Sequence, residues 1–237
     1  VPAEGDVNTG ETLAAAVQRQ QEQGVPIVVS YGMGVDSTAM LVGLHERGIR
    51  PDAINFADTG SEKPETYAYM PVVNEWLREK GWPEITVVKN NPTVSRLTGN
   101  TYSTIEENVL EHKMLPSLAY GGRACSGKWK HQCQDKQVKT WGPGKQALEQ
   151  GYKPARLIGY DAGPVDARRA DMKEDDKFTY VYPLREWKWD REKAKKKIAA
   201  AGLPVPEKSA CFFCPSTKPR EVRAMARKTP DLLRRII

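Results

Sequence analysis

Short apolar runs alternate with longer segments of helical periodicity along the first 90 residues. The runs Val25–Val29, Ala53–Ala57 and Ile85–Val88 have the length and composition of buried strands. Between them, Ser37–Arg47 and Pro64–Lys80 place apolar residues at the spacing of an amphipathic helix. Strands that alternate with helices build parallel βαβ units. The pattern predicts an α/β fold with a doubly wound, mostly parallel sheet of about five strands and helices on both faces.

The same alternation continues with weaker signals in the second half of the chain. Further strands are predicted over Ala155–Tyr160 and Thr179–Leu184. Residues 100–120 have helical character, and Gln134–Gln150 predicts a helix interrupted at its Gly-Pro-Gly. Asp190–Ala201 predicts a helix that begins at an aspartate cap and ends before a glycine.

A glycine-containing turn joins the first predicted strand to the first helix of the sheet. The stretch SYGMGVDSTAML begins at Ser30, and Gly32 and Gly34 permit close approach to the backbone. Amides at a helix start are unpaired and the helix dipole is positive there, so the turn predicts an anion site. A purely structural strand–turn–helix junction is the alternative. Asp36 and Ser37 are also catalytic candidates. The candidate binding residues are Ser30, Gly32, Met33, Gly34, Val35, Asp36, Ser37 and Thr38.

A second polar cluster, DTGSEKPETY, follows the second predicted strand. Asp58 stands at the strand end, where a carboxylate can hold Mg²⁺ or a ribose hydroxyl, and it is a further catalytic candidate. Gly60 permits a tight turn and Pro64 suits the first turn of a helix. The alternative is that this cluster only caps the helix. The candidate binding residues here are Asp58, Thr59, Gly60 and Glu65.

These two clusters resemble the signatures of a known enzyme family. Residues 32–37 resemble the S-G-G-x-D-S loop of the PP-loop ATP pyrophosphatases, with Gly32 in place of the leading Ser and Met33 in place of a Gly. Residues 58–67 resemble the D-T-G and E-x-P-E-T signature of the phosphoadenylyl sulfate (PAPS) reductase-like, or adenine nucleotide alpha hydrolase-like, branch. The resemblance implies that the chain binds ATP with Mg²⁺ and cleaves between the α- and β-phosphates. The DNA phosphorothioation enzymes are one branch of this superfamily.

Two later stretches extend the resemblance, which covers about residues 25–217. Residues 158–170 resemble the family's strand, acidic turn and arginine loop, so Arg168 or Arg169 is a candidate catalytic clamp for phosphate or sulfate. A surface pair beside neighbouring aspartates is the alternative. Residues 182–193 resemble the segment that leads into the family's last helix.

The resemblance and the predicted elements together suggest three regions. We expect an N-terminal helical extension over residues 1–24 and a PP-loop nucleotide-binding α/β domain over residues 25–185. Residues 186–237 form a basic C-terminal segment that carries a C-x2-C motif, and we expect it to pack on the main domain.

Four cysteines form a candidate metal site. Four in a long chain without a secretion signal do not indicate a disulfide framework, and C-x2-C spacing suits metal ligation. Thiolates serve a 4Fe–4S cluster or Zn²⁺ equally well, and the Cys-Pro dipeptide and nearby aromatics favour the cluster, which several members of the resembled family carry. His131 is an alternative ligand, and ordinary buried thiols are the alternative to a metal. The candidate ligands are Cys125, Cys133, Cys211 and Cys214.

Charge is distributed unevenly along the 237 residues. Residues 1–120 hold 9 Lys and Arg against 16 Asp and Glu, a balance of −7, whereas residues 121–237 hold 27 against 14, a balance of +13. A basic second half favours an anionic partner such as a nucleotide or nucleic acid, and a solvated basic surface is the alternative. No run approaches the ~20 apolar residues of a membrane span, and no secretion signal is visible, so we expect a cytoplasmic protein without a membrane partner.

The leading hypothesis is an enzyme that cleaves ATP at the α-phosphate to adenylate an acceptor, for sulfur incorporation into DNA or tRNA. A sulfur donor such as a cysteine desulfurase would then be a partner. The first alternative is a sulfonucleotide reductase, although the C-terminal Glu-Cys-Gly-Leu-His motif and the adjacent Cys-Cys pair of such enzymes are missing from this sequence. The second alternative is a metal-stabilised nucleic-acid-binding module without turnover.

Overall fold

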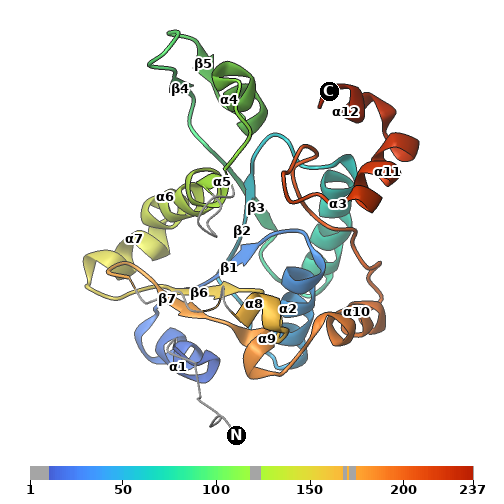
Figure 1. Cartoon of the computed structure of the whole chain (residues 1–237). Coiled ribbons are helices and arrows are strands. Elements are labelled where there is room, and N and C mark those ends of the chain that lie inside the picture. Colours follow the sequence, from blue (N-terminus) through green and yellow to red (C-terminus); the bar gives the residue numbers. More distant parts are fainter. Residues whose placement is uncertain (1–10, 118–123, 168–169, 171–174, 237) are drawn as a thin grey trace, which may run out of the picture.

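Five parallel strands form the central sheet in a computed structural model, which describes residues 11–117, 124–167, 170 and 175–236 (Figure 1). The strand order is β3-β2-β1-β6-β7, and every neighbouring pair is parallel. The predicted α/β fold is thus confirmed. The order runs outward from β1 in both directions, so the chain reverses its direction of winding between β1 and β6. The strands are β1 (Ile27–Tyr31), β2 (Ala53–Asp58), β3 (Ile85–Lys89), β6 (Ala155–Ile158) and β7 (Thr179–Val181).

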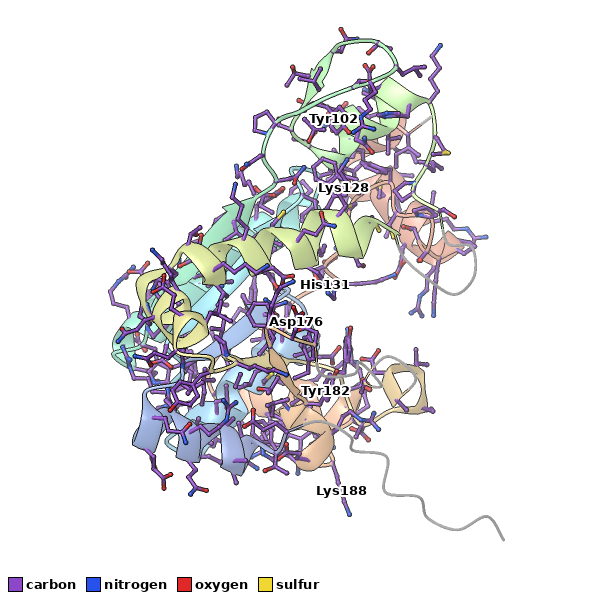
Figure 2. The ribbon with its side chains drawn as sticks, turned by 90° about the vertical axis from the view of Figure 1, so that its left-hand side faces the viewer. Tyr102, Lys128, His131, Asp176, Tyr182 and Lys188 are labelled. Atoms are coloured by element: carbon purple, nitrogen blue, oxygen red, sulfur yellow. The ribbon has the colours of Figure 1, made fainter. Side chains whose placement is uncertain are left out.

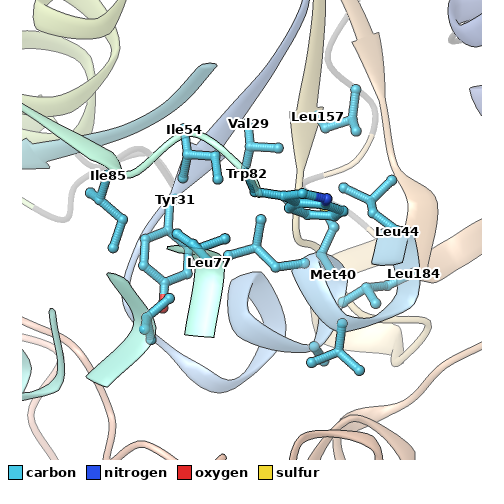
Figure 3. Close-up of a cluster of buried hydrophobic side chains, with 14 of the residues drawn as sticks. Val29, Tyr31, Met40, Leu44, Ile54, Leu77, Trp82, Ile85, Leu157 and Leu184 are labelled. Carbon is cyan, nitrogen blue, oxygen red and sulfur yellow. The ribbon is translucent and has the colours of Figure 1, made fainter. Parts of the chain in front are cut away.

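One face of the sheet is covered by an apolar cluster and its helices. Alternate β1 residues, Ile27, Val29 and Tyr31, project into this cluster, as expected from the two-residue period of a strand. Met40 and Leu44 of the first covering helix meet them there (Figure 3). The helices on this face are α1 (Leu13–Gln23), α2 (Val35–Glu46), α3 (Pro64–Glu79), α9 (Pro183–Glu186) and α10 (Arg191–Ala200).

The opposite face is covered by helices α6 (Gln132–Thr140) and α7 (Gly142–Glu149) (Figure 1). A short helix α5 (Ala124–Ser126) and a π-helical turn η2 (Gly127–His131) lead into α6. Toward β7 this face is apolar, where Val138 packs with aromatic side chains of β7 and its flanks. Toward the carboxyl ends of β1 and β2 it becomes polar.

The remaining elements gather beyond the carboxyl ends of β2 and β3. The hairpin of β4 (Thr93–Val94) and β5 (Thr101–Tyr102) precedes α4 (Ile105–His112), and the C-terminal helices α11 (Pro219–Lys228) and α12 (Pro230–Arg234) lie nearby. A second apolar cluster joins them. Its buried members are Tyr102, Ile105, Trp129, Phe212, Phe213 and Met225. A short helix, α8 (Pro164–Ala167), follows β6.

The sequence-based elements are confirmed in the sheet and are less accurate outside it. The helix predicted over residues 100–120 was too long, because α4 covers only 105–112 and a hairpin strand precedes it. The predicted strand Thr179–Leu184 ends at Val181, since Pro183 begins α9. The first sheet helix begins at Val35, two residues before the predicted start. None of the helices in the described ranges is both long enough and apolar enough to cross a bilayer.

Candidate active site

The turn after β1 is closed by the first turn of α2. Gly32 and Gly34 each donate a backbone N–H to the Ser37 hydroxyl oxygen, at 3.2 and 3.3 Å. Met33 adopts a positive φ of 53° and buries its side chain. Helix geometry leaves the first-turn amides of α2 without intrahelical partners, and they begin directly after this turn. The loop therefore offers helix-start amides to an anion, together with two glycine amides that hold a side-chain hydroxyl.

Two neighbouring segments press against this loop. A Cβ on Gly159, just after β6, would lie 2.9 Å from the backbone N and Cα of Ser37. A Cβ on Gly34 would lie 3.0 Å from the hydroxyl of Ser209, which belongs to the segment before the C-x2-C motif. Glycine at these positions permits the close packing. Segments distant in sequence thus enclose the loop on two sides.

Three carboxylates stand at the mouth of the loop. Asp36, Asp161 and Asp166 each offer an oxygen, and these oxygens lie within 4.8 Å of one another. Arg191, the first residue of α10, forms an ion pair with Oδ2 of Asp36, whereas Oδ1 of Asp36 is buried without a hydrogen-bond partner. Carboxylate oxygens are the ligands that Mg²⁺ prefers. The donor set and the unpartnered oxygen therefore fit a magnesium ion.

Burial raises the pKa of Asp36 to about 6. The Arg191 guanidinium opposes this shift, while the carboxylates of Asp161 and Asp166 add to it. The charged form of Asp36 is therefore less favourable in the folded protein than in water, even with Arg191 beside it, and a bound cation would stabilise that form.

The second predicted cluster organises its own turn. Oδ1 of Asp58 accepts from the Gly60 amide at 2.8 Å and from the Tyr67 hydroxyl at 2.7 Å, and Oδ2 lies 3.3 Å from Nζ of Lys89. The Asp58 carboxylate thus holds the turn between β2 and α3. Thr59 is buried, and its hydroxyl lies 3.4 Å from Sγ of Cys211.

Other predicted loop residues take different positions. Thr38 is fully buried, and its hydroxyl lies 3.0 Å from the hydroxyl of Tyr31 on the core side of the helix. Glu65 lines a different cavity of 220 Å³, between the start of α3 and α11. Neither side chain faces the turn after β1, residues 32–37, which is called the anion loop below. Arg168 and Arg169, the predicted clamp, lie outside the described residues.

A cavity of 120 Å³ opens beside the loop, on the face covered by α6. Ser30 and Gly32 border it from β1 and the loop, and Arg156 borders it from β6. Lys130 and His131 of the π-helical turn complete its rim. His131 lies on one side of this turn, while Lys128 lies on the other and donates to the Tyr102 hydroxyl at 3.0 Å (Figure 2).

Three of the four cysteines gather in one region. Cys211 forms an isolated backbone bridge with Glu62, and the Phe212 amide donates to Ser61 at 3.0 Å, so the C-x2-C loop is fixed to the turn after β2. The Cys214 amide donates to the Cys211 carbonyl at 3.1 Å, and Cys125 packs on the same apolar cluster as Cys211.

Cys133 lies apart from these three. It is buried in α6 and packs against Ala57 and Val88 of the sheet. Among the described residues, the acidic triad is the one set of three metal-binding groups whose ligand atoms lie within 4.8 Å. The structure therefore does not bring the four predicted thiols together: Cys133 lies apart, and within the described ranges no three thiols lie within 4.8 Å of one another.

An ion pair connects the cysteine region to the loop cavity. Nζ of Lys130 lies 2.9 Å from Oε1 of Glu62, whose side chain is fully buried and whose Oε2 has no hydrogen-bond partner. Burial lowers the pKa of Lys130, but Glu62, with smaller contributions from Cys211 and Cys125, raises it above its ordinary value. Burial raises the pKa of Cys211 to about 11, and the charge of Glu62 adds to this shift. At neutral pH this thiol is protonated.

Several residues of the candidate site were not predicted from the sequence. Lys130 stands in a lysine-flanked stretch and Glu62 in a recognised motif, yet nothing local indicates that they pair. The sequence indicates a site role for Arg191 only through its place in residues 182–193, the stretch that resembles the family. Asp161 and Asp166 stood in the acidic turn after β6, which indicated their position but not their role.

The chain was compared with known families, curated proteins and solved structures. No family model matches the chain, and no curated protein matches it. Among solved structures it is similar to PAPS reductase from Candida auris in a phosphate complex, with 19% identity, a TM-score of 0.47, and coverage of 81% of this chain and 82% of that one. It is also similar to the U34-tRNA thiolase NcsA from Methanococcus maripaludis, which was solved with its 4Fe-4S cluster, with 13% identity, a TM-score of 0.43, and coverage of 93% and 74%.

The buried position of Asp36 predicts a pH-dependent stability. Its folded pKa of about 6 exceeds the ordinary value of 3.8, so the folded state binds the proton more tightly between these values and stability falls as pH rises through them. Asp36→Asn should therefore exceed the wild type in unfolding free energy by about 1–3 kcal/mol at pH 7.5, and by much less at pH 4.5.

Urea unfolding at the two pH values measures this difference. Asp176→Asn is the matched control, because its side chain is 81% exposed and should change stability little at either pH. An Asp36→Asn protein that is less stable than the wild type at pH 7.5 would contradict the assignment.

Proposed function

We propose that the protein is an ATP pyrophosphatase-type enzyme that cleaves ATP between the α- and β-phosphates and adenylates an acceptor. The observation that carries this proposal is the position of the loop and the Asp36, Asp161 and Asp166 triad. Both stand at the carboxyl edge of the sheet, where the winding reverses between β1 and β6. In open parallel sheets, ligands bind in the crevice at this point.

The reaction assigns a task to each part of the site. An acceptor oxygen attacks the α-phosphorus, the bond from that phosphorus to the bridging oxygen breaks, and pyrophosphate leaves with the electron pair. The amides at the start of α2 stabilise the charge that grows on the leaving group. Bound Mg²⁺, held by the acidic triad, would neutralise phosphate charge. Arg191 lies beside Asp36, from where its guanidinium can contact a phosphate oxygen.

Release of pyrophosphate is the direct test. With ATP, Mg²⁺ and a mixture of tRNA and DNA as acceptors, the wild type should form pyrophosphate, and Asp36→Ala should reduce the rate by roughly 10²-fold because a group that positions charge is lost. Asp176→Asn should retain the wild-type rate. Sulfite released from a sulfonucleotide, with no pyrophosphate from ATP, would instead identify a reductase.

The cysteine region supports a metal centre held by Cys125, Cys211 and Cys214. A 4Fe–4S cluster would supply a site for sulfur or electron chemistry, and Zn²⁺ would only hold the fold. Burial and the charge of Glu62 raise the pKa of Cys211, which argues against a free thiolate nucleophile. Lys130 and Glu62 place this region next to the loop cavity.

Cysteine variants separate a three-thiol centre from a four-thiol centre. After anaerobic purification, serine at position 125, 211 or 214 should remove most bound metal and any visible absorption band. Cys133→Ser should retain both, because Cys133 packs against Ala57 and Val88 instead. Metal content per chain and the visible spectrum report the result. Loss of metal in Cys133→Ser as complete as in the other variants would restore the four-thiol site.

A nucleic acid is the acceptor that the C-terminal helix favours. Arg220, Arg223 and Arg227 are exposed at positions i, i+3 and i+7 of α11, so they share one side of the helix. Within the described part of the chain none of the three forms an ion pair. Met225 of the same helix packs on the cluster that contains Phe212 and Phe213, beside the cysteine region. A row of unpaired arginines next to the site suits a phosphate backbone.

Alanine at Arg220, Arg223 and Arg227 should weaken binding of tRNA or DNA. Three lost phosphate contacts should reduce the slope of log K against log salt by about 2–3. Fluorescence anisotropy with labelled nucleic acid over a range of salt measures this slope. An unchanged slope would exclude α11 as the contact. The matched control replaces three paired lysines outside α11, Lys145, Lys195 and Lys197.

A further inference from the structure

The interior under α6 is polar where a sheet face is normally apolar. Ser30 and Asn55 stand side by side on β1 and β2 and project toward α6. The Ser30 hydroxyl donates to Oε1 of Gln134 at 2.8 Å, and Nε2 of Gln134 donates to the backbone carbonyl of Asn55 at 3.1 Å. Both the oxygen and the nitrogen of the Gln134 side-chain amide are therefore hydrogen-bonded. The guanidinium of Arg156, in the same layer, has two nitrogens without a hydrogen-bond partner.

Arg156 is a buried arginine in the middle of the sheet. The residue is 2% exposed and lies on β6 between Val28 and Tyr180 of the adjacent strands. Its Nη1 donates to Asp135 at 2.5 Å, and its guanidinium carbon lies 4.0 Å from the ring centre of Phe178. The Asp135 contact fixes one end of the guanidinium, and the Phe178 ring fixes its plane.

The other edge of the Arg156 guanidinium has no partner. Nε and Nη2 are both buried and make no hydrogen bond. These two nitrogens form the edge that presents two parallel N–H groups, which is the geometry that holds two oxygens of one carboxylate, phosphate or sulfate. Buried donors without partners are destabilising, and charged ones more so, so an occupant that supplies acceptors is favoured.

Nearby carboxylates are already engaged. Asp135 pairs with Nη1 of Arg156. Asp175 accepts from the amides of Lys177 and Phe178 at 2.8 and 2.7 Å, and from the Tyr180 hydroxyl at 2.8 Å. Neither carboxylate therefore serves the Nε and Nη2 edge.

The cavity beside Arg156 has the size and charge for a small anion. Its volume is 120 Å³, and Lys130 lines it together with Arg156, while no Asp or Glu stands among its lining residues in the described part of the chain. A cavity of about 150 Å³ holds a benzene ring, so this one does not accept a purine with its ribose. The cavity reaches Gly32 of the anion loop, so an occupant would lie beside a bound nucleotide.

We propose that Arg156 and this cavity bind a tetrahedral oxyanion, sulfate or phosphate, as a second subsite distinct from the anion loop. The inference rests on the proposed function in one respect, since it places this oxyanion beside the ATP that the loop would bind. The fork of Arg156 supplies two parallel hydrogen bonds to two oxygens, and Lys130, which pairs with Glu62, lines the same cavity. The loop amides remain for the polyphosphate.

Titration calorimetry with sodium sulfate and with sodium phosphate, at ionic strength held constant with chloride, tests the subsite. Arg156→Lys retains the charge and loses the fork, so it should weaken binding of the preferred ion at least 10-fold. Arg78→Lys, whose side chain is 64% exposed on α3, is the matched control and should bind as the wild type does. Tighter binding of sulfate or of phosphate identifies the ion, and either result supports the subsite. Equal affinities of Arg156→Lys and the wild type would overturn it.

A crystal of the wild-type protein soaked in selenate locates the ion without relying on a variant that folds. Anomalous density within hydrogen-bond distance of Nε and Nη2 of Arg156 is the expected result, and density confined to the loop or absent from this cavity would overturn the inference. Both measurements omit ATP, so they are independent of turnover. Oxyanion binding at Arg156 without pyrophosphate release would refute the proposed function alone, and pyrophosphate release without this binding would refute the subsite alone.

Discussion

The close approach of the β6 end to the first turn of α2 is the contact on which the candidate site depends. With a Cβ on Gly159, the backbone of Ser37 would be only 2.9 Å away, so a larger residue would force the strand and the helix apart. The contact lies where the sheet changes its direction of winding. It therefore sets the distance between the anion loop, which follows β1, and Asp161 and Asp166, which follow β6. The loop and the acidic triad share one rigid support.

The side chains of Lys130 and Glu62 connect the loop cavity, the turn after β2 and the cysteine region. Lys130 borders the loop cavity and pairs with the buried Glu62, which is bridged through its backbone to Cys211. Charge at the cysteine region is thus felt at the cavity through one ion pair with little solvent between its partners. A change of charge on the thiols would alter the balance at Lys130 and, through it, the anion affinity of the cavity. The site is best regarded as one electrostatic unit.

Local patterns in the sequence were sufficient for the sheet and for the loop. Apolar runs of strand length predicted all five strands within a few residues, because burial of a central strand imposes its composition directly. The turn at Gly32 and Gly34 was equally visible, since a ligand loop needs particular residues at consecutive positions. Contacts between distant residues were not predictable in this way. Arg191 and Asp36 are 155 positions apart, and no local rule states that they meet. The predicted thiol set failed to converge for a related reason: Cys133 follows Cys125 by eight residues, and the intervening π-helical turn and α6 direct it toward Ala57.

The hydroxyl of Ser37 gives the anion loop a resting state of its own. Because Oγ already accepts from two glycine amides at 3.2 and 3.3 Å, the loop keeps its shape while no ligand is bound. An incoming anion exchanges these long bonds for shorter ones and displaces one small rotor, so little reorganisation is required. A polyphosphate would present several charged oxygens to these amides, whereas a monovalent ion presents a single charge, so the exchange would favour the polyphosphate. Selectivity for highly charged ligands would thus arise because the Ser37 hydroxyl holds the Gly32 and Gly34 amides until such a ligand replaces it.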